Sequence, residues 1–217
     1  MDDIKQKIID FLRRNRVSTT EVADCLGKSG VVPDVMPVVS GMYSAGEIKY
    51  VYAHSESNWP VHEQIQQITP GTVVFIDAIN VNDRSIVGEL VVKYLHLYCQ
   101  AVAVVTPGKM RDANDLIRNR YPVWCHGFSP VGCFNTQVEE TDEIRQAVIL
   151  GREKYDGAIA VCDDSGVVII LRDNITEEFY GKLEHIEKQE DIWFNCIDSK
   201  KWTTFETVCL KKYLTEQ

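Results

Sequence analysis

The sequence predicts an α/β fold, and three features of the chain support this prediction. Two short, apolar runs rich in β-branched and small residues, 73–76 and 101–105, have the composition of buried strands. Residues 87–98, between them, have the length and apolar content of a helix that packs on a sheet. Further apolar runs after residue 120 supply more strands, so the chain suits a single domain with a sizeable core.

The central strand–helix–strand unit predicts where ligands bind. If its two strands are parallel, they deliver Asp77 and the adjacent Arg111 and Asp112 to the same edge of the sheet. That edge is where open α/β sheets usually bind ligands. A turn is expected at residues 106–110, just before the Arg-Asp pair.

The first 30 residues predict two N-terminal helices. Apolar residues recur at helical spacing over 2–15, and Ser18 with Glu21 three residues later forms a capping-box pattern. Gly27 would end this second helix. Residues 31–39 are expected to form an apolar connector.

The remaining elements follow from local patterns. The predicted strands are 48–54, 121–127, 147–151, 158–162 and 167–171, the last two joined by a hairpin turn at 163–166. The predicted helices are 61–68, 176–193 and a possible last helix, so that 176–217 is a C-terminal helical region. His54 ends a strand and could contact a ligand, although a lone histidine there is more often simply packed or at the surface.

Composition excludes several classes of protein. With 45% hydrophobic residues, 25% charged residues and no apolar run of transmembrane length, the chain is expected to be cytoplasmic, without a membrane partner. A net charge of -9 without a basic stripe argues against nucleic acid as a partner. The seven cysteines are odd in number and lack a CxxC pair, so reduced thiols are expected.

Arg111 beside Asp112 is the sharpest candidate for chemistry. A guanidinium can bind the oxygens of a keto acid, and a carboxylate can hold a hard divalent cation such as Mg2+. The alternative is a neighbouring ion pair on a solvated loop. Motifs for nucleotide binding, serine hydrolysis and HExxH zinc sites are absent, and adjacent strand residues such as Cys125 and His126 point to opposite faces.

An ordered set of segments resembles a known family. The segments are 17–27, 70–77, 88–90, 111–115, 122–132 and 163–168. Their order is similar to that of the regulator of ribonuclease activity A-like (RraA-like) family, which includes 4-hydroxy-4-methyl-2-oxoglutarate aldolases with oxaloacetate decarboxylase activity. The resemblance implies a β/β/α swivelling-type sandwich over residues 1–217, assembled as a homotrimer or homohexamer with sites between subunits.

The resemblance also implies roles for individual residues. Arg111 would bind the keto-acid oxygen and Asp112 would hold Mg2+ or Mn2+. Further acids would act through metal-bound waters or as ligands, and these map to Asp77 or Glu89, to Asp115 and, from a neighbouring subunit, to Glu187 or Glu190. Asn80 and Gly88 would join Arg111 in binding the substrate.

The implied reaction is cleavage or decarboxylation of a small 2-oxo acid through a pyruvate enolate. Relatives that only regulate ribonucleases typically lack the metal-binding aspartate, and Asp112 is present here, which favours the enzyme. The alternative is a non-catalytic regulator that binds a ribonuclease or another protein. Methyl transfer from S-adenosylmethionine ranks last because no glycine-rich cofactor loop is found. The loop at 78–82 is bulkier than the family's glycine-rich version, so the resemblance does not identify the acyl partner, the part of the substrate that is cleaved from pyruvate.

Overall fold

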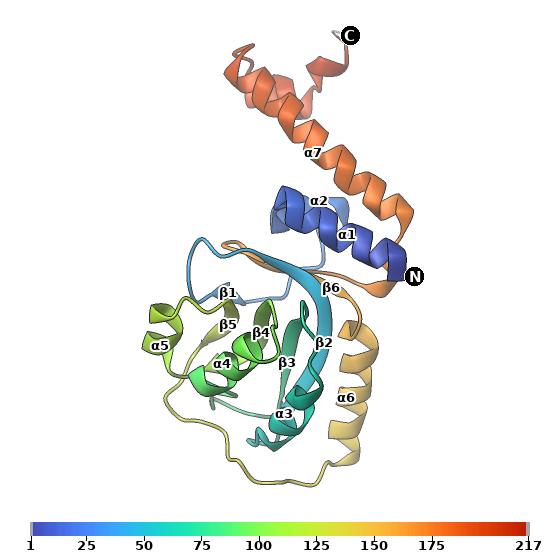
Figure 1. Ribbon diagram of the computed structural model, residues 1–217. Coiled ribbons are helices and arrows are strands. Elements are labelled where there is room, and N and C mark those ends of the chain that lie inside the picture. The colour runs from blue at the N-terminus through green and yellow to red at the C-terminus, as the bar shows by residue number, and fades with distance from the viewer. Residues whose placement is uncertain (1, 216–217) are drawn as a thin grey trace.

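Seven strands form one curled sheet at the centre of the computed structural model, which describes residues 2–215 (Figure 1). The strands are β1 (Met36–Pro37), β2 (Ser44–His54), β3 (Val73–Ile79), β4 (Ala103–Met110), β5 (Val123–Phe128), β6 (Ile159–Asp163) and β7 (Gly166–Ile170). They lie in the order β1-β5-β4-β3-β2-β6-β7. Strands β2 to β5 are parallel, whereas β1, β6 and β7 pair antiparallel with their neighbours. The sheet is therefore mixed and barrel-like, nearly closed on itself.

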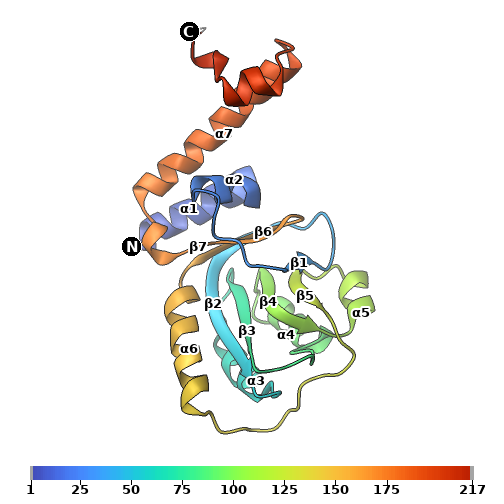
Figure 2. The same cartoon turned by 180° about the vertical axis from the view of Figure 1, so that it is seen from behind.

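Helices cover this sheet on several sides (Figure 2). They are α1 (Asp2–Asn15), α2 (Thr19–Cys25), α3 (Trp59–Gln64), α4 (Glu89–Leu97), α5 (Ala113–Arg118), α6 (Asp142–Tyr155) and α7 (Glu177–Asp198), with short turns η1 (Ile65–Gln67), η2 (Arg172–Asn174), η3 (Phe205–Cys209) and η4 (Lys212–Leu214). Apolar residues of α3, α4 and α5 share one core with the central strands. Residues of α6 pack on the opposite side of β2 and β3, and α1, α2 and α7 pack on β6 and β7. Between residues 2 and 215, every helix is too short or too polar to cross a lipid bilayer.

The predicted central crossover is confirmed. Strands β3 and β4 are parallel and joined through α4, with Val73 paired to Ala103. Alternate residues of β3 point to opposite faces, so Val74 and Ile76 lie in the core under α4 while Phe75 lies in the core under α6. This alternation decides which side of the sheet each candidate residue reaches.

The N-terminal prediction is also confirmed. Ser18 caps α2, where its hydroxyl accepts from the Glu21 amide at 3.2 Å and the Glu21 carboxylate accepts from the Ser18 amide at 2.7 Å. Gly27 follows α2 with a φ of 70°. All seven cysteines are free, and Cys125 is buried while its neighbour His126 is exposed.

Three local predictions are wrong. Residues 147–151 lie inside α6, where Ile144 and Val148 are buried one turn apart and charged residues flank the apolar run, so the helical period prevails. The expected turn at 106–110 is the second half of β4, which accommodates Pro107 and Gly108 at a shift in its pairing with β5. Part of the 31–39 connector pairs with β5 as β1.

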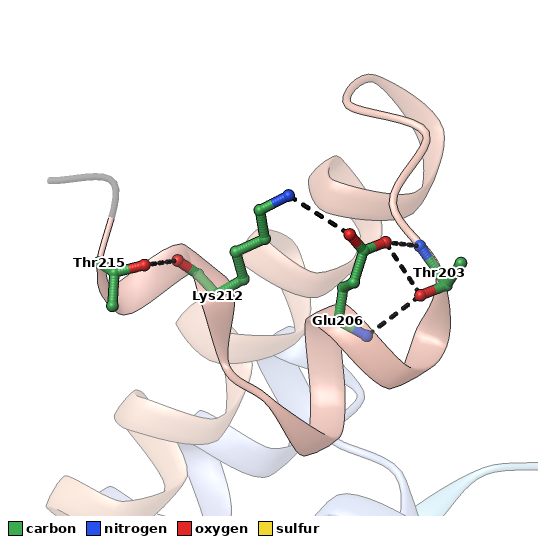
Figure 3. Close-up of polar contacts among 4 residues, drawn as sticks. All are labelled: Thr203, Glu206, Lys212 and Thr215. Carbon is green, nitrogen blue, oxygen red and sulfur yellow. Dashed lines mark hydrogen bonds and ion pairs between the residues drawn. The ribbon is translucent and has the colours of Figure 1, made fainter.

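The C-terminal helical region begins as expected and then projects from the body. Thr176 caps α7, which runs away from the sheet in both views (Figures 1 and 2). Its end folds back through short turns, where the Glu206 carboxylate accepts from Thr203 and Lys212 (Figure 3). Met1, Glu216 and Gln217, which the predicted terminal helical regions include, lie outside the described residues.

Candidate functional site

The candidate site lies where three chain segments run side by side. On one side, the segment 85–87 is hydrogen-bonded to the end of β4. The Ile86 amide donates to the Lys109 carbonyl at 2.8 Å, and the Arg111 amide donates to the Val87 carbonyl at 3.1 Å. On its other side it bonds to the loop that follows β5, where the Ser85 amide donates to the Val131 carbonyl at 2.8 Å. These bonds bring the turn after β4, the start of α4 and the 129–133 loop together. Arg111 and Asp112 lie at this junction.

Arg111 presents its guanidinium to solvent. Its side chain is 49% exposed, and its Nε lies 3.8 Å from the Asp112 carboxylate. The backbone amide of Arg111 is fixed by the Val87 carbonyl. Within residues 2–215, neither terminal guanidinium nitrogen makes a hydrogen bond. This pair of donors is therefore free to bind two oxygens of a ligand.

Asp112 is held in place by its backbone and by one of its two carboxylate oxygens. It begins α5 with a φ of 59°, a left-handed conformation that Asp and Asn adopt more readily than other residues with a side chain. Its Oδ2 accepts from the Glu89 amide at the start of α4, at 3.0 Å. Its Oδ1 has no hydrogen-bond donor in the described part of the chain. One carboxylate oxygen is thus positioned and the other is available.

Gly88 provides the close approach that this arrangement needs. A Cβ at this position would lie 2.1 Å from Asp112 Oδ2 and 2.7 Å from Arg111 Cγ. The backbone of Gly88 is extended, with a φ of -135° that any residue adopts, so the need for glycine is entirely one of space. The sequence analysis predicts that Gly88 binds the substrate, and in the structure Gly88 packs against both residues of the pair.

Gly132 is a site residue for which the sequence analysis proposed no role. A Cβ there would lie 2.8 Å from Arg111 Nη1. The Arg84 guanidinium donates to the Gly132 carbonyl at 3.0 Å, pairs with Glu56 at 3.0 Å and lies over the Phe134 ring. The sequence signal was present, because Gly132 lies in the 122–132 segment that carried the family resemblance. Arg84 has no such signal.

Asp77 lies on the other side of the sheet from the Arg-Asp pair. It follows Phe75 on the face of β3 that α6 covers. Its Oδ2 accepts from the Tyr50 hydroxyl and its Oδ1 from the Ala78 amide, both at 2.8 Å. The pKa of Tyr50 is raised, mainly by burial and secondly by the negative charge of Asp77. The Tyr50 hydroxyl therefore stays protonated and donates to Asp77. The expected shared edge holds, but Asp77 and Arg111 do not converge.

The other predicted residues divide between the site and its surroundings. Glu89 adjoins the pair, since its amide binds Asp112 and its carboxylate accepts from Tyr121 at 3.5 Å. Asp115 forms an ion pair with Arg118 at 2.5 Å. Asn80 is exposed after β3, in a left-handed conformation with a φ of 54°. Lys109 is paired with Asp83 at 2.9 Å.

Glu190 belongs to α7 and lies far from this junction in its own copy. Helix α5, which begins directly after Asp112, sits on the body away from α7 in both views (Figures 1 and 2). Burial and the nearby carboxylates of Glu21 and Glu187 raise the pKa of Glu190. Among residues 2–215 no group of three His, Cys, Asp or Glu side chains could hold a metal. One copy therefore offers the free Oδ1 of Asp112 beside Arg111, a donor that suits a cation which keeps most of its ligands as water.

The fold has counterparts among solved structures. An uncharacterized protein from Pseudomonas syringae pv. tomato superimposes with a TM-score of 0.71 at 21% identity, covering 93% of this chain and 96% of that chain. Streptomyces coelicolor RraAS2, described as an unusual member of the RNase ES inhibitor RraA protein family, gives a TM-score of 0.65 at 19% identity, covering 85% and 95%. At these identities the likeness shows a shared fold.

Sequence comparisons supply the family. Protein DlpA of Legionella pneumophila is 25% identical in an alignment of 187 residues that covers 82% of this chain and 29% of DlpA. The chain therefore spans less than a third of that curated relative. The family model described as RraA-like, Aldolase/RraA, matches residues 19–169. This match covers more than half of the sequence and includes Arg111, Asp112 and both glycines that contact them. The chain therefore belongs to the RraA-like family.

Proposed function

We propose that this protein is a divalent-cation-dependent lyase that cleaves or decarboxylates small 2-oxo acids through a pyruvate enolate. The observation that carries the proposal is the convergence of Arg111 and Asp112. Arg111 has free guanidinium nitrogens and Asp112 has a free carboxylate oxygen, and their side chains are 49% and 41% exposed. The family description, which joins aldolase with RraA, supports the same reading.

Arg111 would act on the oxygen where negative charge develops. When the C3–C4 bond of a 2-oxo acid breaks, its electron pair moves through C3 onto the C2 carbonyl oxygen to give the enolate, which later takes up a proton at C3. A fixed guanidinium stabilises this oxygen more than that of the neutral carbonyl. Gly88 and Gly132 leave room for the arginine side chain that does this. The backbone bond from Arg111 to Val87 fixes the start of that side chain.

Asp112 would hold Mg2+ or Mn2+ through its free Oδ1. The fit is supported by the carboxylate oxygen that hard cations prefer, and by the absence of a side chain at Gly88, which lets Asp112 pack beside Arg111. When bound, such a cation supplies Lewis-acid charge beside the carbonyl. Glu89 adjoins this position, and Asp115 would join only by leaving Arg118. Asp77, held by Tyr50 on the opposite face, takes no part in the proposed step.

A second copy of the chain would complete the ligand set with its Glu190. The projecting α7 arm carries exposed apolar side chains that a single copy leaves uncovered. They include Ile192, Phe194, Phe205, Leu210 and Leu214, which are 42–63% exposed. Covering such a surface favours association. We therefore propose a homotrimer or homohexamer in which the arm of one subunit reaches the Arg111 region of another.

The exposed arm also fits a second function. A non-catalytic regulator that docks a ribonuclease or other protein would use the same apolar side chains, and the RraAS2 relative is described as a member of an RNase ES inhibitor family. Metal-dependent activity separates the two functions, because a regulator has no use for a cation held at Asp112.

The test is pyruvate release from oxaloacetate with Mg2+, with Mn2+ and with a chelator. We expect the wild type to release pyruvate only with a divalent cation present, and we expect Asp112→Asn to lose this cation-dependent release. Asparagine tolerates the left-handed backbone at this position, so the fold is retained. Asp173→Asn, at an exposed position on η2, is the control and is expected to behave as wild type. Wild-type release that ignores chelation, or no release at all, would remove the lyase proposal.

A further inference from the structure

A cavity with a different chemistry lies on the other side of the sheet from Arg111. It measures about 340 Å³ and opens at the end of β2, between the start of α3 and the segment that leads into α6. Tyr52 lies on the face of β2 that packs toward α6, as Asp77 does on β3. The volume falls near the lower end of the range for small-molecule sites, about 300–1,000 Å³. The cavity therefore has room for a small ligand, independent of the proposed lyase site.

The lining of this cavity is acidic. Glu63, Glu139 and Glu140 contribute carboxylates, and the Tyr52 hydroxyl donates to Glu140 Oε1 at 2.5 Å. Neither Glu63 nor Glu139 forms an ion pair with any residue in the described range 2–215. The lining therefore carries more carboxylate charge than the ion pairs of residues 2–215 neutralise.

One cation reaches the cavity, and it is already engaged. Arg145 donates to the Glu140 carbonyl at 2.7 Å and forms an ion pair with Asp142, which lies outside the lining. Its positive charge is thus matched by a carboxylate that the cavity does not use. An anionic ligand would gain little from Arg145 and would face three carboxylates.

His54 gives independent evidence that the cavity is a binding site. This residue is 1% exposed and lines the cavity, and its Nδ1 lies 3.1 Å from the Ser55 hydroxyl. Its Nε2 has no hydrogen-bond partner in the described part of the chain. Burial lowers the pKa of His54, which favours the neutral ring. When Nδ1 donates to Ser55, Nε2 is an acceptor that has no protein donor among the described residues, so a ligand in the cavity can supply one.

Aromatic rings complete the lining. Trp59 is 38% exposed at the start of α3, and Tyr52 stacks on His54 with ring centroids 6.0 Å apart. The faces of Trp and Tyr rings attract organic cations. Carboxylates, a neutral imidazole acceptor and aromatic rings all favour the same ligand, one that carries positive charge and N–H donors on a small apolar body.

We propose that this cavity binds a small alkylammonium ion. The ammonium group donates to Glu140 and to Nε2 of His54, and Glu63 and Glu139 add favourable charge. The alkyl part lies against Trp59. The family match does not assign this site, and its role does not depend on the lyase activity.

The probe is n-butylammonium chloride, followed by the indole N–H resonance of Trp59 in NMR spectra. We expect a saturable shift of that resonance, with the buried Trp124 as an internal reference that does not move. Uncharged n-butanol and anionic butyrate, which have the same chain length, are expected to cause no saturable shift. Glu140→Gln, which keeps an acceptor for Tyr52, and Glu63→Gln should each weaken binding about tenfold.

Glu143→Gln, an exposed residue of α6 outside the lining, is the matched control and should bind as wild type. If Glu140→Gln unfolds, the exposed and unpaired Glu63 decides the test. The proposal is overturned if butyrate shifts Trp59 as strongly as butylammonium. It is also overturned if butylammonium does not saturate, or if Glu63→Gln binds as tightly as the control.

Discussion

Arg111→Ala should reduce kcat/KM for pyruvate release from oxaloacetate about 10²–10³-fold, as expected when a donor to a developing oxyanion is removed. The guanidinium has two free nitrogens in an exposed position, so its removal takes away binding of the oxygen without leaving a buried group unpaired. The assay is steady-state pyruvate release with saturating Mg2+. Because the interaction strengthens as charge develops, most of the loss should appear in kcat.

The matched control for this substitution is Arg14→Ala. Arg14 is an exposed arginine on α1, far along the chain from the site, and the substitution should leave both kinetic constants unchanged. Arg111→Lys keeps the charge but loses the planar fork, so it should fall between Arg111→Ala and wild type. Equal activity in Arg111→Ala and wild type would refute a role for the guanidinium.

Gly88→Ala should abolish most activity while the protein stays folded. The new methyl group would lie 2.1 Å from Asp112 Oδ2 and 2.7 Å from Arg111 Cγ, so both side chains must move. Displacements of about 1 Å at a reacting centre cost about 10²-fold in rate. The extended backbone of Gly88 accepts alanine, and Asp112 is exposed, so the disturbance stays local. Steady-state kinetics and thermal unfolding of the same samples measure the two effects.

Gly181→Ala is the control for adding a methyl group. A Cβ at Gly181 meets no atom within 4 Å, and alanine suits the interior of α7 better than glycine. This variant should keep full activity and lose no stability. Full activity in Gly88→Ala would show that the close packing of Gly88 against the pair has no functional meaning.

Much of the fold follows from local sequence signals. The β3–α4–β4 crossover, the Ser18 capping box and the β6–β7 hairpin each depend on residues close together in the chain, and each was predictable. Residues 147–151 were misassigned because a short apolar run fits a strand or a buried helix equally well. In the structure, the burial of Ile144 and Val148, four residues apart, decides for the helix.

The site was predictable only as far as neighbours in sequence determine it. Arg111 and Asp112 are adjacent, so their proximity needed no tertiary information. The packing of Gly132 against Arg111 depends on a bond from Arg84, 48 residues earlier in the chain, and no local pattern encodes it. The sequence correctly predicted the edge of the sheet at which Asp77 lies. It did not predict the face, because a shift of one residue along β3 moves a side chain to the opposite face. Tyr50 on the neighbouring strand holds Asp77 on the face away from Arg111.

Deuterium exchange into the methyl group of pyruvate tests the central proposal most directly. In D2O with Mg2+, the exchange requires the enolate that Arg111 and Asp112 are proposed to stabilise, and NMR measures it without a coupled enzyme. The account predicts exchange by the wild type that stops on chelation and falls at least about 10²-fold in both Arg111→Ala and Asp112→Asn. Exchange that is absent in the wild type, or unchanged in either variant, would contradict it.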